Sequence, residues 1–280
     1  MKIGVHVSIA GSIDLSIDRA KDLSVDTFQI FTRNPRGWKS SDLKETEITN
    51  FKQKLDNSNL DLPVCHMPYL PNLSSPRKEV YELSVKTLIS ELNRCNLLGI
   101  KFVVTHIGSH LGTGIEQGLG RVIDGCNSAL KNTSGDVMII LENAAGSKNS
   151  VGSKFEELQF IHENIEESNR VGFCFDTCHA FAAGYDLRTK QKINETFAKF
   201  DKTIGLENLK VVHLNDSKGD LGGGLDRHEH IGLGQIGDDG FRVLLDTNMV
   251  KDLPFILETP IDENIGNQEN IAKIRSFVSI

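Results

Sequence analysis

The segment at residues 213–234, HLNDSKGDLGGGLDRHEHIGLG, places several side chains that bind metal ions beside a flexible connection. His213 ends an apolar run, and Asp226, His228 and His230 follow the glycine-rich stretch. Imidazole nitrogens and carboxylate oxygens are donors that suit Zn²⁺ and Mn²⁺. Asp226 and His228 are two residues apart, so an extended backbone would direct both side chains to the same side. The segment therefore predicts part of a metal site.

A second segment, DTCH, places Asp176 and His179 three residues apart. If a helical turn begins at this point, both side chains face one cavity. Cys178 lies between them and is interpreted as a small buried residue beside two ligands. Spacing alone does not assign any of these donors to a particular metal ion.

Metal-binding side chains also occur where short apolar runs end. Eight such runs are predicted as strands, and they end at or near His6, Thr32, His66, His106, Glu142, Asp176, His213 and Glu258. In a parallel barrel the carboxyl ends of all strands meet at one rim, where such enzymes build their active sites. A single histidine at a strand end is usually only hydrogen-bonded. Carboxylates gathered together need neutralising cations, however, so the whole set favours a metal centre.

The elements that must position these residues alternate along the chain. The predicted strands are residues 2–8, 27–32, 62–66, 101–106, 137–143, 171–177, 209–215 and 254–259, and patterns typical of helices lie between them, as at 12–23, 80–99, 153–167 and 267–278. Eight βα units with nearly continuous apolar strands predict an α/β fold, a single (β/α)8 TIM barrel, with an open doubly wound sheet as the competing topology. No linker or repeat divides the chain, so residues 1–280 are expected to form one domain.

The composition is that of a globular protein with a sizeable core, at 39% hydrophobic and 25% charged residues. The net charge of −7 weighs against a polyanionic partner, although bound metal cations would offset much of it. No segment is long and apolar enough for a membrane span or a secretory signal, so no membrane contact is expected. The five cysteines do not predict a disulfide framework and favour a reducing cytoplasm.

The sequence resembles the endonuclease IV family of abasic-site (AP) endonucleases over essentially the whole chain. The resemblance is carried by HMPYLPNLSSP at 66–76, THIGSH at 105–110, LENAAG at 141–146, GFCFDTCHAFAAGYD at 172–186, HLNDSK with DRH between 213 and 228, and LETP at 257–260. The motifs DTCHAFAAGYD and HLNDSK with DRH are long and specific. Ile107 and the neighbours of Asn72-Leu73 depart from the family pattern, but every expected metal ligand is present.

The resemblance implies a barrel that holds three Zn²⁺ ions per chain, with Mn²⁺ as an alternative at one position. The ligands carried over are His66, His106 and Glu142 for the first metal, Glu142 again with Asp176, His213 and Glu258 for the second, and His179, Asp226 and His228 for the third. Glu142, shared by the paired metals, is the expected catalytic residue, and no side-chain nucleophile is required. Histidines 6, 110 and 230 are expected to support the ligands or to lie on the rim.

The implied activity is hydrolysis of the DNA phosphodiester bond 5′ to an abasic site, leaving a 3′-hydroxyl, with 3′-end trimming, in base excision repair. The protein would then be a deoxyribonuclease IV, a phosphoric diester hydrolase, that acts as a monomer on double-stranded DNA. By the same resemblance Arg36, Tyr69 and Leu70 enter the duplex, where a nucleotide without its base is cheap to rotate out. The competing interpretations are a solvated charge for Arg36 and a packed ring for Tyr69. Candidate phosphate contacts are Arg33, Lys39 and Lys218.

Two other functions compete with this one. A sugar isomerase or epimerase resembling xylose isomerase would hold one divalent ion with Glu142, Asp176, His213 and Glu258, but it leaves the other five predicted ligands without a task. A damage-recognition protein would bind abasic DNA without cutting it and hold zinc structurally. Structural zinc sites normally have four protein ligands, so the three-ligand sets favour catalysis.

Overall fold

Eight parallel strands close into a barrel in the computed structural model, which describes residues 1–278. The strands are β1 (Lys2–His6), β2 (Thr27–Ile30), β3 (Val64–His66), β4 (Phe102–His106), β5 (Met138–Glu142), β6 (Val171–Asp176), β7 (Leu209–His213) and β10 (Pro254–Leu257). Their order around the barrel is β1-β10-β7-β6-β5-β4-β3-β2, and every neighbouring pair is parallel. The predicted TIM barrel is confirmed, and the open doubly wound sheet is wrong because β1 closes on β10.

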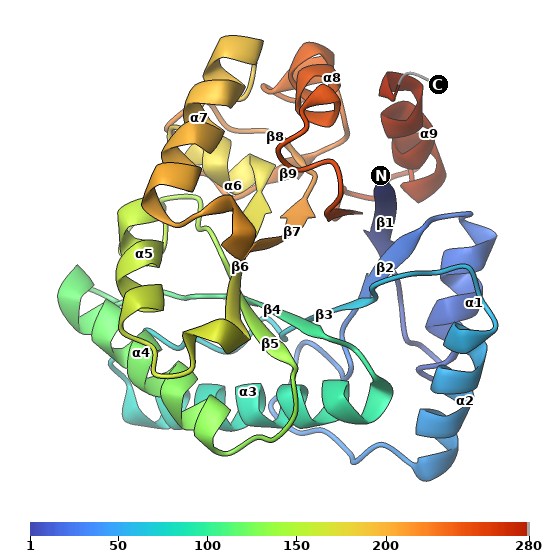
Figure 1. Ribbon diagram of the computed structural model, residues 1–280, viewed down its shortest axis with the longest axis vertical. Helices are drawn as coiled ribbons and strands as arrows, with labels where there is room; N and C mark the ends of the chain where they lie inside the picture. The colour runs from blue at the N-terminus through green and yellow to red at the C-terminus, as the bar shows by residue number, and fades with distance from the viewer. Residues whose placement is uncertain (279–280) are drawn as a thin grey trace.

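Helices cover the outer face of the barrel (Figure 1). They are α1 (Leu15–Asp22), α2 (Glu45–Asp56), α3 (Lys78–Leu98), α4 (Ile115–Lys131), α5 (Phe155–Glu163), α7 (Lys190–Thr203), α8 (Gly237–Asp246) and α9 (Asn267–Phe277), with short 3-10 turns at Ser168–Arg170 and Leu206–Asn208. Another short helix, α6 (Thr177–Ala182), follows β6 without a connecting loop. Helix α3 ends at Gly99, whose φ of +77° is left-handed and suits glycine at the end of a helix.

Two apolar layers stabilise the barrel, because alternate residues of a strand point outward to the helices and inward to the axis. Outward residues such as Phe28, Phe173 and Phe255 belong to the main core between strands and helices. The inward residues form a separate buried cluster of Val64, Val104, Ile140, Cys174, Val211 and Ile256. Side chains therefore fill the barrel interior, which is not a pore.

A polar layer lies directly above this inner cluster. Two positions after each inner residue comes a polar one with the same orientation, giving the pairs Val64–His66, Val104–His106, Ile140–Glu142, Cys174–Asp176, Val211–His213 and Ile256–Glu258. On β1 and β2 the same spacing leads from Gly4 to His6 and from Thr27 to Gln29, and the two strands pair at these positions. A Cβ at Gly4 would lie 2.5 Å from the Thr27 carbonyl oxygen, so only glycine allows this close approach.

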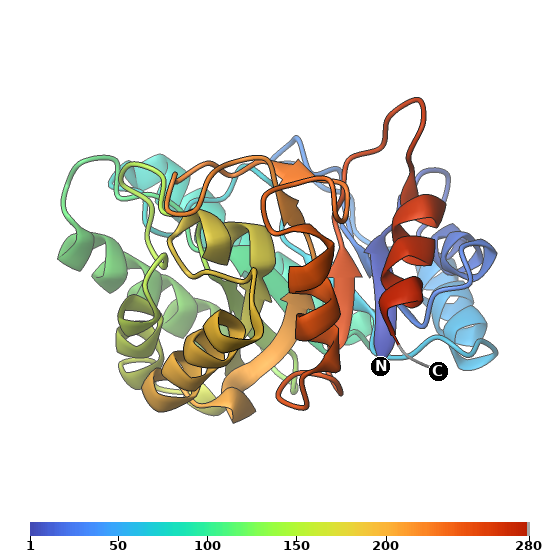
Figure 2. The same ribbon diagram turned by 90° about the horizontal axis from the view of Figure 1, so that it is seen from above.

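The loops after the strands lie at one end of the barrel, and both chain termini lie toward the other (Figure 2). Within the long connection between β7 and α8, β8 (Asp216–Ser217) and β9 (His228–Glu229) form a small antiparallel sheet. All five cysteines are free and buried. Among the described residues, none of the helices is both long and apolar enough to cross a membrane.

Candidate metal centre

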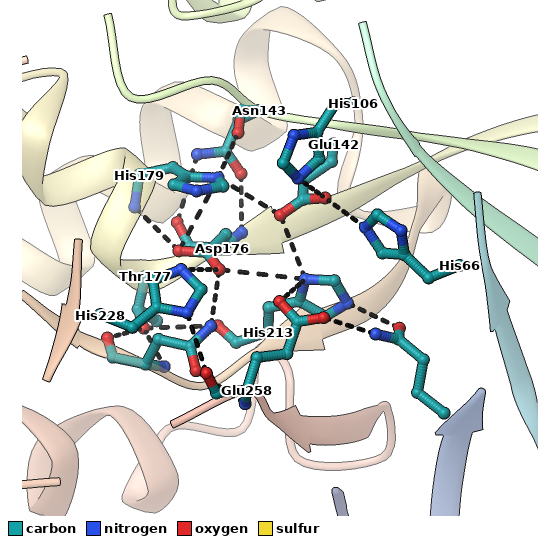
Figure 3. Close-up of polar contacts among 12 residues, drawn as sticks. His66, His106, Glu142, Asn143, Asp176, Thr177, His179, His213, His228 and Glu258 are labelled. Atoms are coloured by element: carbon teal, nitrogen blue, oxygen red, sulfur yellow. Dashed lines mark hydrogen bonds and ion pairs between the residues drawn. The ribbon is translucent and has the colours of Figure 1, made fainter. Parts of the chain in front are cut away.

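The nine predicted ligands come together at the carboxyl end of the barrel. The side chains of all of them except Asp226, which the picture does not label, point toward one another in Figure 3. In each of three groups the donor atoms lie within 4.8 Å of one another. The groups are His66, His106 and Glu142; Glu142, Asp176, His213 and Glu258; and His179, Asp226 and His228. The fold thus assembles the three expected sets from separate strands and loops, while their binding of metal stays a prediction.

Glu142 lies at the centre of the cluster and faces imidazoles with both carboxylate oxygens. Its Oε2 is 3.3 Å from His66 Nε2 and 3.2 Å from His106 Nε2, and its Oε1 is 3.1 Å from His213 Nδ1 and 3.2 Å from His179 Nδ1. The carboxylate is buried, whereas the side chain of His106 is 48% exposed. The two oxygens therefore face different histidine groups, as a bridging ligand requires.

Asp176 joins the metal cluster to the start of a helix. It is the N-cap of α6, and its Oδ1 accepts a hydrogen bond of 2.8 Å from the main-chain N–H of His179. This contact confirms the helical turn predicted for DTCH. The other oxygen, Oδ2, accepts 2.7 Å from the amide of Asn215 and lies 3.6 Å from His228 Nε2. One carboxylate thus caps the helix and contributes to the cluster.

The glycine-rich loop folds onto α6 and brings Asp226 and His228 to His179. Gly222 and Gly224 donate their main-chain N–H groups to carbonyls of α6 at 3.0 and 2.9 Å. Both have left-handed φ values, +73° and +67°, which explains why glycine occurs here. Asp226 Oδ1 then lies 3.1 Å from His179 Nε2, and His228 Nε2 lies 3.9 Å from the same oxygen.

Two buried nitrogens in this third group are left without hydrogen bonds. Within residues 1–278, His179 Nε2 and His228 Nε2 are inaccessible to solvent and have no aligned partner, although Asp226 is close. Such unpaired buried groups are costly unless something binds them. Two imidazole nitrogens and a carboxylate that converge in this way are a donor set that fits a divalent cation.

The charges in the cluster offset one another in the absence of metal. Burial opposes ionisation of Glu142, but His106 and His213 hold its pKa well below the ordinary value. Burial likewise opposes charge on His213, yet neighbouring Cys174 and the carboxylates of Glu258 and Glu142 raise its pKa well above the ordinary value. Contact with His179 lowers the pKa of Asp226 to about 2. Protonated imidazoles therefore supply the positive charge that neutralises the carboxylates when no metal ion is bound.

Two cysteines also lie within reach of the donors but make poor ligands. Cys174 is near Glu142 and His213, and Cys178 is near Asp176 and His228. Burial raises the pKa of both thiols to about 12, so they stay protonated. This agrees with the interpretation of Cys178 as a small buried residue.

Several polar residues around the ligands were missed in the sequence. Asn143 exchanges two hydrogen bonds with the main chain of Asp176, and Asn215 connects the Asp176 carboxylate to the main-chain N–H of Glu258. Gln29 is fully buried between His213 and Glu258. The asparagines follow ligands in LEN and HLN, and Gln29 interrupts the apolar run TFQI. These positions, close to a ligand or within an apolar strand, are the features of the sequence that indicate a role for the three residues.

Just after β2, which ends at Ile30, the sequence suggests two other polar residues, and the structure corrects both. Thr32, taken as the strand end, points toward α3 and donates to Glu91 at 2.6 Å. Arg33, proposed as a phosphate contact, is buried and ion-paired with Glu91, so this prediction is wrong. Both side chains follow the end of β2 and bind α3, whereas Gln29, within the strand, lies in the polar layer beside the ligands.

The three histidines that are expected to support the ligands or to lie on the rim, His6, His110 and His230, make different contacts. His6 lies in the polar layer, 3.8 Å from Glu258 and 3.1 Å from Gln29. His230 binds Asp262 at 2.9 Å, at the loop after β10. His110 accepts two main-chain hydrogen bonds within its own loop.

The residues predicted to bind DNA surround the cluster at the rim. Tyr69 and Leu70 are 65% and 40% exposed, and Arg36 is exposed on the preceding loop. The main-chain N–H of Tyr69 donates to the Pro35 carbonyl at 3.2 Å, which joins the two loops. A cavity of about 400 Å³ reaches from Tyr69 and Leu70 to Glu142. The Tyr69 ring is exposed but also packs edge-on against Phe31, so its contact with DNA stays a prediction.

Comparisons with known proteins agree with this arrangement. A family model described as "Xylose isomerase-like TIM barrel" matches residues 17–277. A protein of Nitrosopumilus maritimus named "Probable endonuclease 4" is 53% identical over 279 residues, covering 99% of this chain and all of that one. This chain belongs to the endonuclease IV family. Endonuclease IV from Thermus thermophilus has a crystal structure with a TM-score of 0.89 and 36% identity, covering 99% of this chain and 98% of the other.

Membership of the endonuclease IV family rests on more than a shared barrel fold. A D-tagatose 3-epimerase-like protein has a TM-score of 0.72 and 21% identity, covering 99% of this chain and 97% of the other. That likeness shows the fold alone. Sugar-modifying enzymes therefore use the same architecture, and the residues at the rim have to distinguish the functions.

Proposed function

We propose that this protein is a metal-dependent endonuclease that hydrolyses DNA on the 5′ side of an abasic site and leaves a 3′-hydroxyl. Trimming of 3′ ends by the same centre is part of the proposal. The observation that carries it is the convergence of nine donor residues in three groups, two of which share Glu142, beside a cavity. Full-length similarity to proteins named endonuclease 4 supports the same activity.

The cations we propose are three Zn²⁺ ions, with Mn²⁺ as an alternative at one position. They would supply Lewis-acid chemistry: polarisation of the phosphate and a lower pKa for water. His66 and His106 would hold the first, His213, Asp176 and Glu258 the second, and His179, Asp226 and His228 the third. Glu142 would bind both of the first two, since each of its oxygens faces a different group.

The chain's own residues position the substrate. We propose that Arg36, Tyr69 and Leu70 enter the duplex beside the damaged nucleotide, since all three are exposed on two joined loops above the cavity. The abasic nucleotide would turn into that cavity, where exposed His106 and buried Glu142 face the phosphate. Asn143 and Asn215 keep Asp176 in place through hydrogen bonds on both sides.

We also propose that the protein acts as a monomer in a reducing compartment such as the cytoplasm. All nine donors come from one chain, and the barrel closes on itself. The five cysteines are free and buried, which supports a reducing environment.

A duplex oligonucleotide with one abasic analogue tests the proposal. Purified zinc-loaded protein should cut the damaged strand 5′ to the lesion, and the new end should support extension by a DNA polymerase because it carries a 3′-hydroxyl. Glu142→Gln should abolish cleavage, since an amide cannot bind two cations as an anionic bridge. Glu163→Gln, on the exposed face of α5, is the matched control and should cut normally.

The same cleavage assay, together with an assay on sugars and a count of bound metal ions, distinguishes the proposed function from the two alternatives. An intact strand that the zinc-loaded protein nevertheless binds would favour a recognition protein without catalysis. Activity on sugars with about one divalent ion per chain would favour an isomerase. That alternative would use Glu142, Asp176, His213 and Glu258 and would leave the unpaired nitrogens of His179 and His228 unexplained.

A further inference from the structure

We propose that Gln29 is a positioning residue that determines which nitrogen of His213 faces the metal centre and that holds Glu258 beside it. Gln29 comes from β2 and occupies the layer that supplies the ligands on other strands. Its side chain is fully buried, and its carboxamide lies between His6, His213 and Glu258. The inference rests on the proposed function because it assumes the metal centre.

The hydrogen bond between Gln29 and His213 has one possible direction. Gln29 Oε1 lies 2.9 Å from His213 Nε2, and an amide oxygen only accepts. Nε2 therefore carries the hydrogen, whichever protonation state the ring adopts. The nitrogen left for a cation is Nδ1, which lies 3.1 Å from Glu142 Oε1 and 3.3 Å from Glu258 Oε2.

The amide group of Gln29 fixes the second ligand. Its Nε2 donates to Glu258 Oε1 at 2.6 Å, which leaves Oε2 turned toward His213 Nδ1. The remaining amide hydrogen points to His6 Nδ1 at 3.1 Å. If the carboxamide were turned by 180°, its oxygen would face the Glu258 carboxylate, which only accepts hydrogen bonds when ionised. That contact would be repulsive, so Glu258 determines the orientation of the amide.

His213 differs in this respect from two other histidines of the cluster. His66 and His228 donate from Nδ1 to main-chain carbonyls, at 2.6 Å to Met67 and 3.1 Å to Glu258, and thus turn Nε2 toward the carboxylates. A main-chain partner cannot be removed by substitution. His213 presents the opposite nitrogen and is held by a side chain. The side chain at position 29 therefore determines the orientation of His213.

Zinc affinity of the intact protein tests the role of Gln29. Gln29→Met keeps nearly the same shape and removes both halves of the amide, and Gln29→Glu keeps an acceptor for His213 but repels Glu258. Both should weaken zinc binding about 10- to 100-fold in competition with a chromogenic chelator, the usual effect of losing a partner that orients a metal ligand. Thr27→Val is the control, because Thr27 is buried on the same strand but binds the Leu62 carbonyl; its zinc affinity should be unchanged.

A second measurement needs no variant. In zinc-loaded protein labelled with ¹⁵N-histidine, the resonances of His213 should show a protonated Nε2 and a metal-bound Nδ1. Binding through Nε2 would overturn the inference. Unchanged zinc affinity in both Gln29 variants would also overturn it while the proposed function stood. Failure of the unmodified protein to bind zinc would overturn both.

Discussion

Each of three histidines in the cluster has one ring nitrogen committed to the protein and the other turned toward carboxylates. His66 and His228 use main-chain carbonyls for the first contact, and His213 uses Gln29. A ring held in this way loses little further freedom when it binds a cation. The same nitrogens attract protons when no cation is present, so protons and metal ions compete for them.

This competition predicts an unusual dependence of stability on pH in the metal-free protein. The raised pKa values of His179 and His213 stabilise the fold below the ordinary value of 6.5, and that contribution is lost as pH rises through the raised values. The lowered pKa of Glu258, about 2, stabilises the fold above the ordinary 4.5 and is lost as pH falls. The melting temperature with chelator present should therefore be highest in mildly acidic buffer and fall above neutral pH.

Thermal denaturation over a pH series, followed by circular dichroism, checks this expectation. Zinc-loaded protein is the control and should stay stable in alkaline buffer, because cations replace the protons. A metal-free protein that became steadily more stable through neutral pH would contradict the assignment of charge to His179 and His213.

The sequence predicted these ligands because charged or imidazole side chains stand out at the ends of apolar runs. Gln29 does not stand out, since an uncharged amide within TFQI is typical of a buried strand, and the pattern indicates Thr32 as the polar strand end instead. Asn143 and Asn215 are recognised by their partners rather than by their type. Such partners come from distant strands, and a single sequence does not show the register between them.

At the scale of elements, two loops on neighbouring strands form the part of the rim that we propose contacts DNA. The loop after β2 carries Arg36 and the loop after β3 carries Tyr69, and a main-chain hydrogen bond joins them. Below them the Tyr69 ring packs edge-on against Phe31, with centroids 5.1 Å apart. At the start of the loop after β2, Arg33 and Thr32 bind Glu91 of α3 and anchor this loop.

Removing the Tyr69 ring should weaken recognition of damaged DNA without disturbing the metals. Stacking of a base on an aromatic side chain contributes about 1–3 kcal/mol, so Tyr69→Ala should lower kcat/KM on an abasic duplex roughly 10- to 100-fold. Phe160→Ala is the matched control, because this phenylalanine is 46% exposed on α5, and it should have no effect. A Tyr69→Ala protein with normal kcat/KM would show that the ring does not contact the substrate.

The elements themselves were largely predictable, but the fine structure of the loops was not. Each predicted strand contains an observed one, and the observed strands are mostly shorter because pairing ends before the apolar run does. The small sheet of β8 and β9 was not predicted. It lies in a polar, glycine-rich loop whose shape is set by contacts with α6 and not by its own periodicity.

For the molecule as a whole, the metal cluster connects strands that adjoin one another only through the closed sheet. Six of the eight strands place a predicted ligand at or just beyond their carboxyl ends, and the remaining two supply His6 and Gln29. A cation bound here contacts residues that are distant in sequence. Binding that occurs in the folded state and not in the unfolded chain stabilises the fold.

Metal removal should therefore lower the melting temperature of the whole domain. One site at a free zinc concentration 100 times its Kd adds about 2.7 kcal/mol to the free energy of unfolding, so the shift should grow with zinc concentration. Differential scanning calorimetry of chelated and zinc-titrated protein measures it. The shift should be smaller in Glu142→Gln, and a melting temperature independent of zinc would contradict a metal centre that joins the strands.

Glu258 follows the last strand of the barrel, more than a hundred residues after the central Glu142. A growing polypeptide on the ribosome therefore lacks a complete centre until β10 has emerged and inserted between β1 and β7. A partly made or truncated chain cannot assemble the same centre. Nuclease activity should therefore require that the chain has been synthesised through β10.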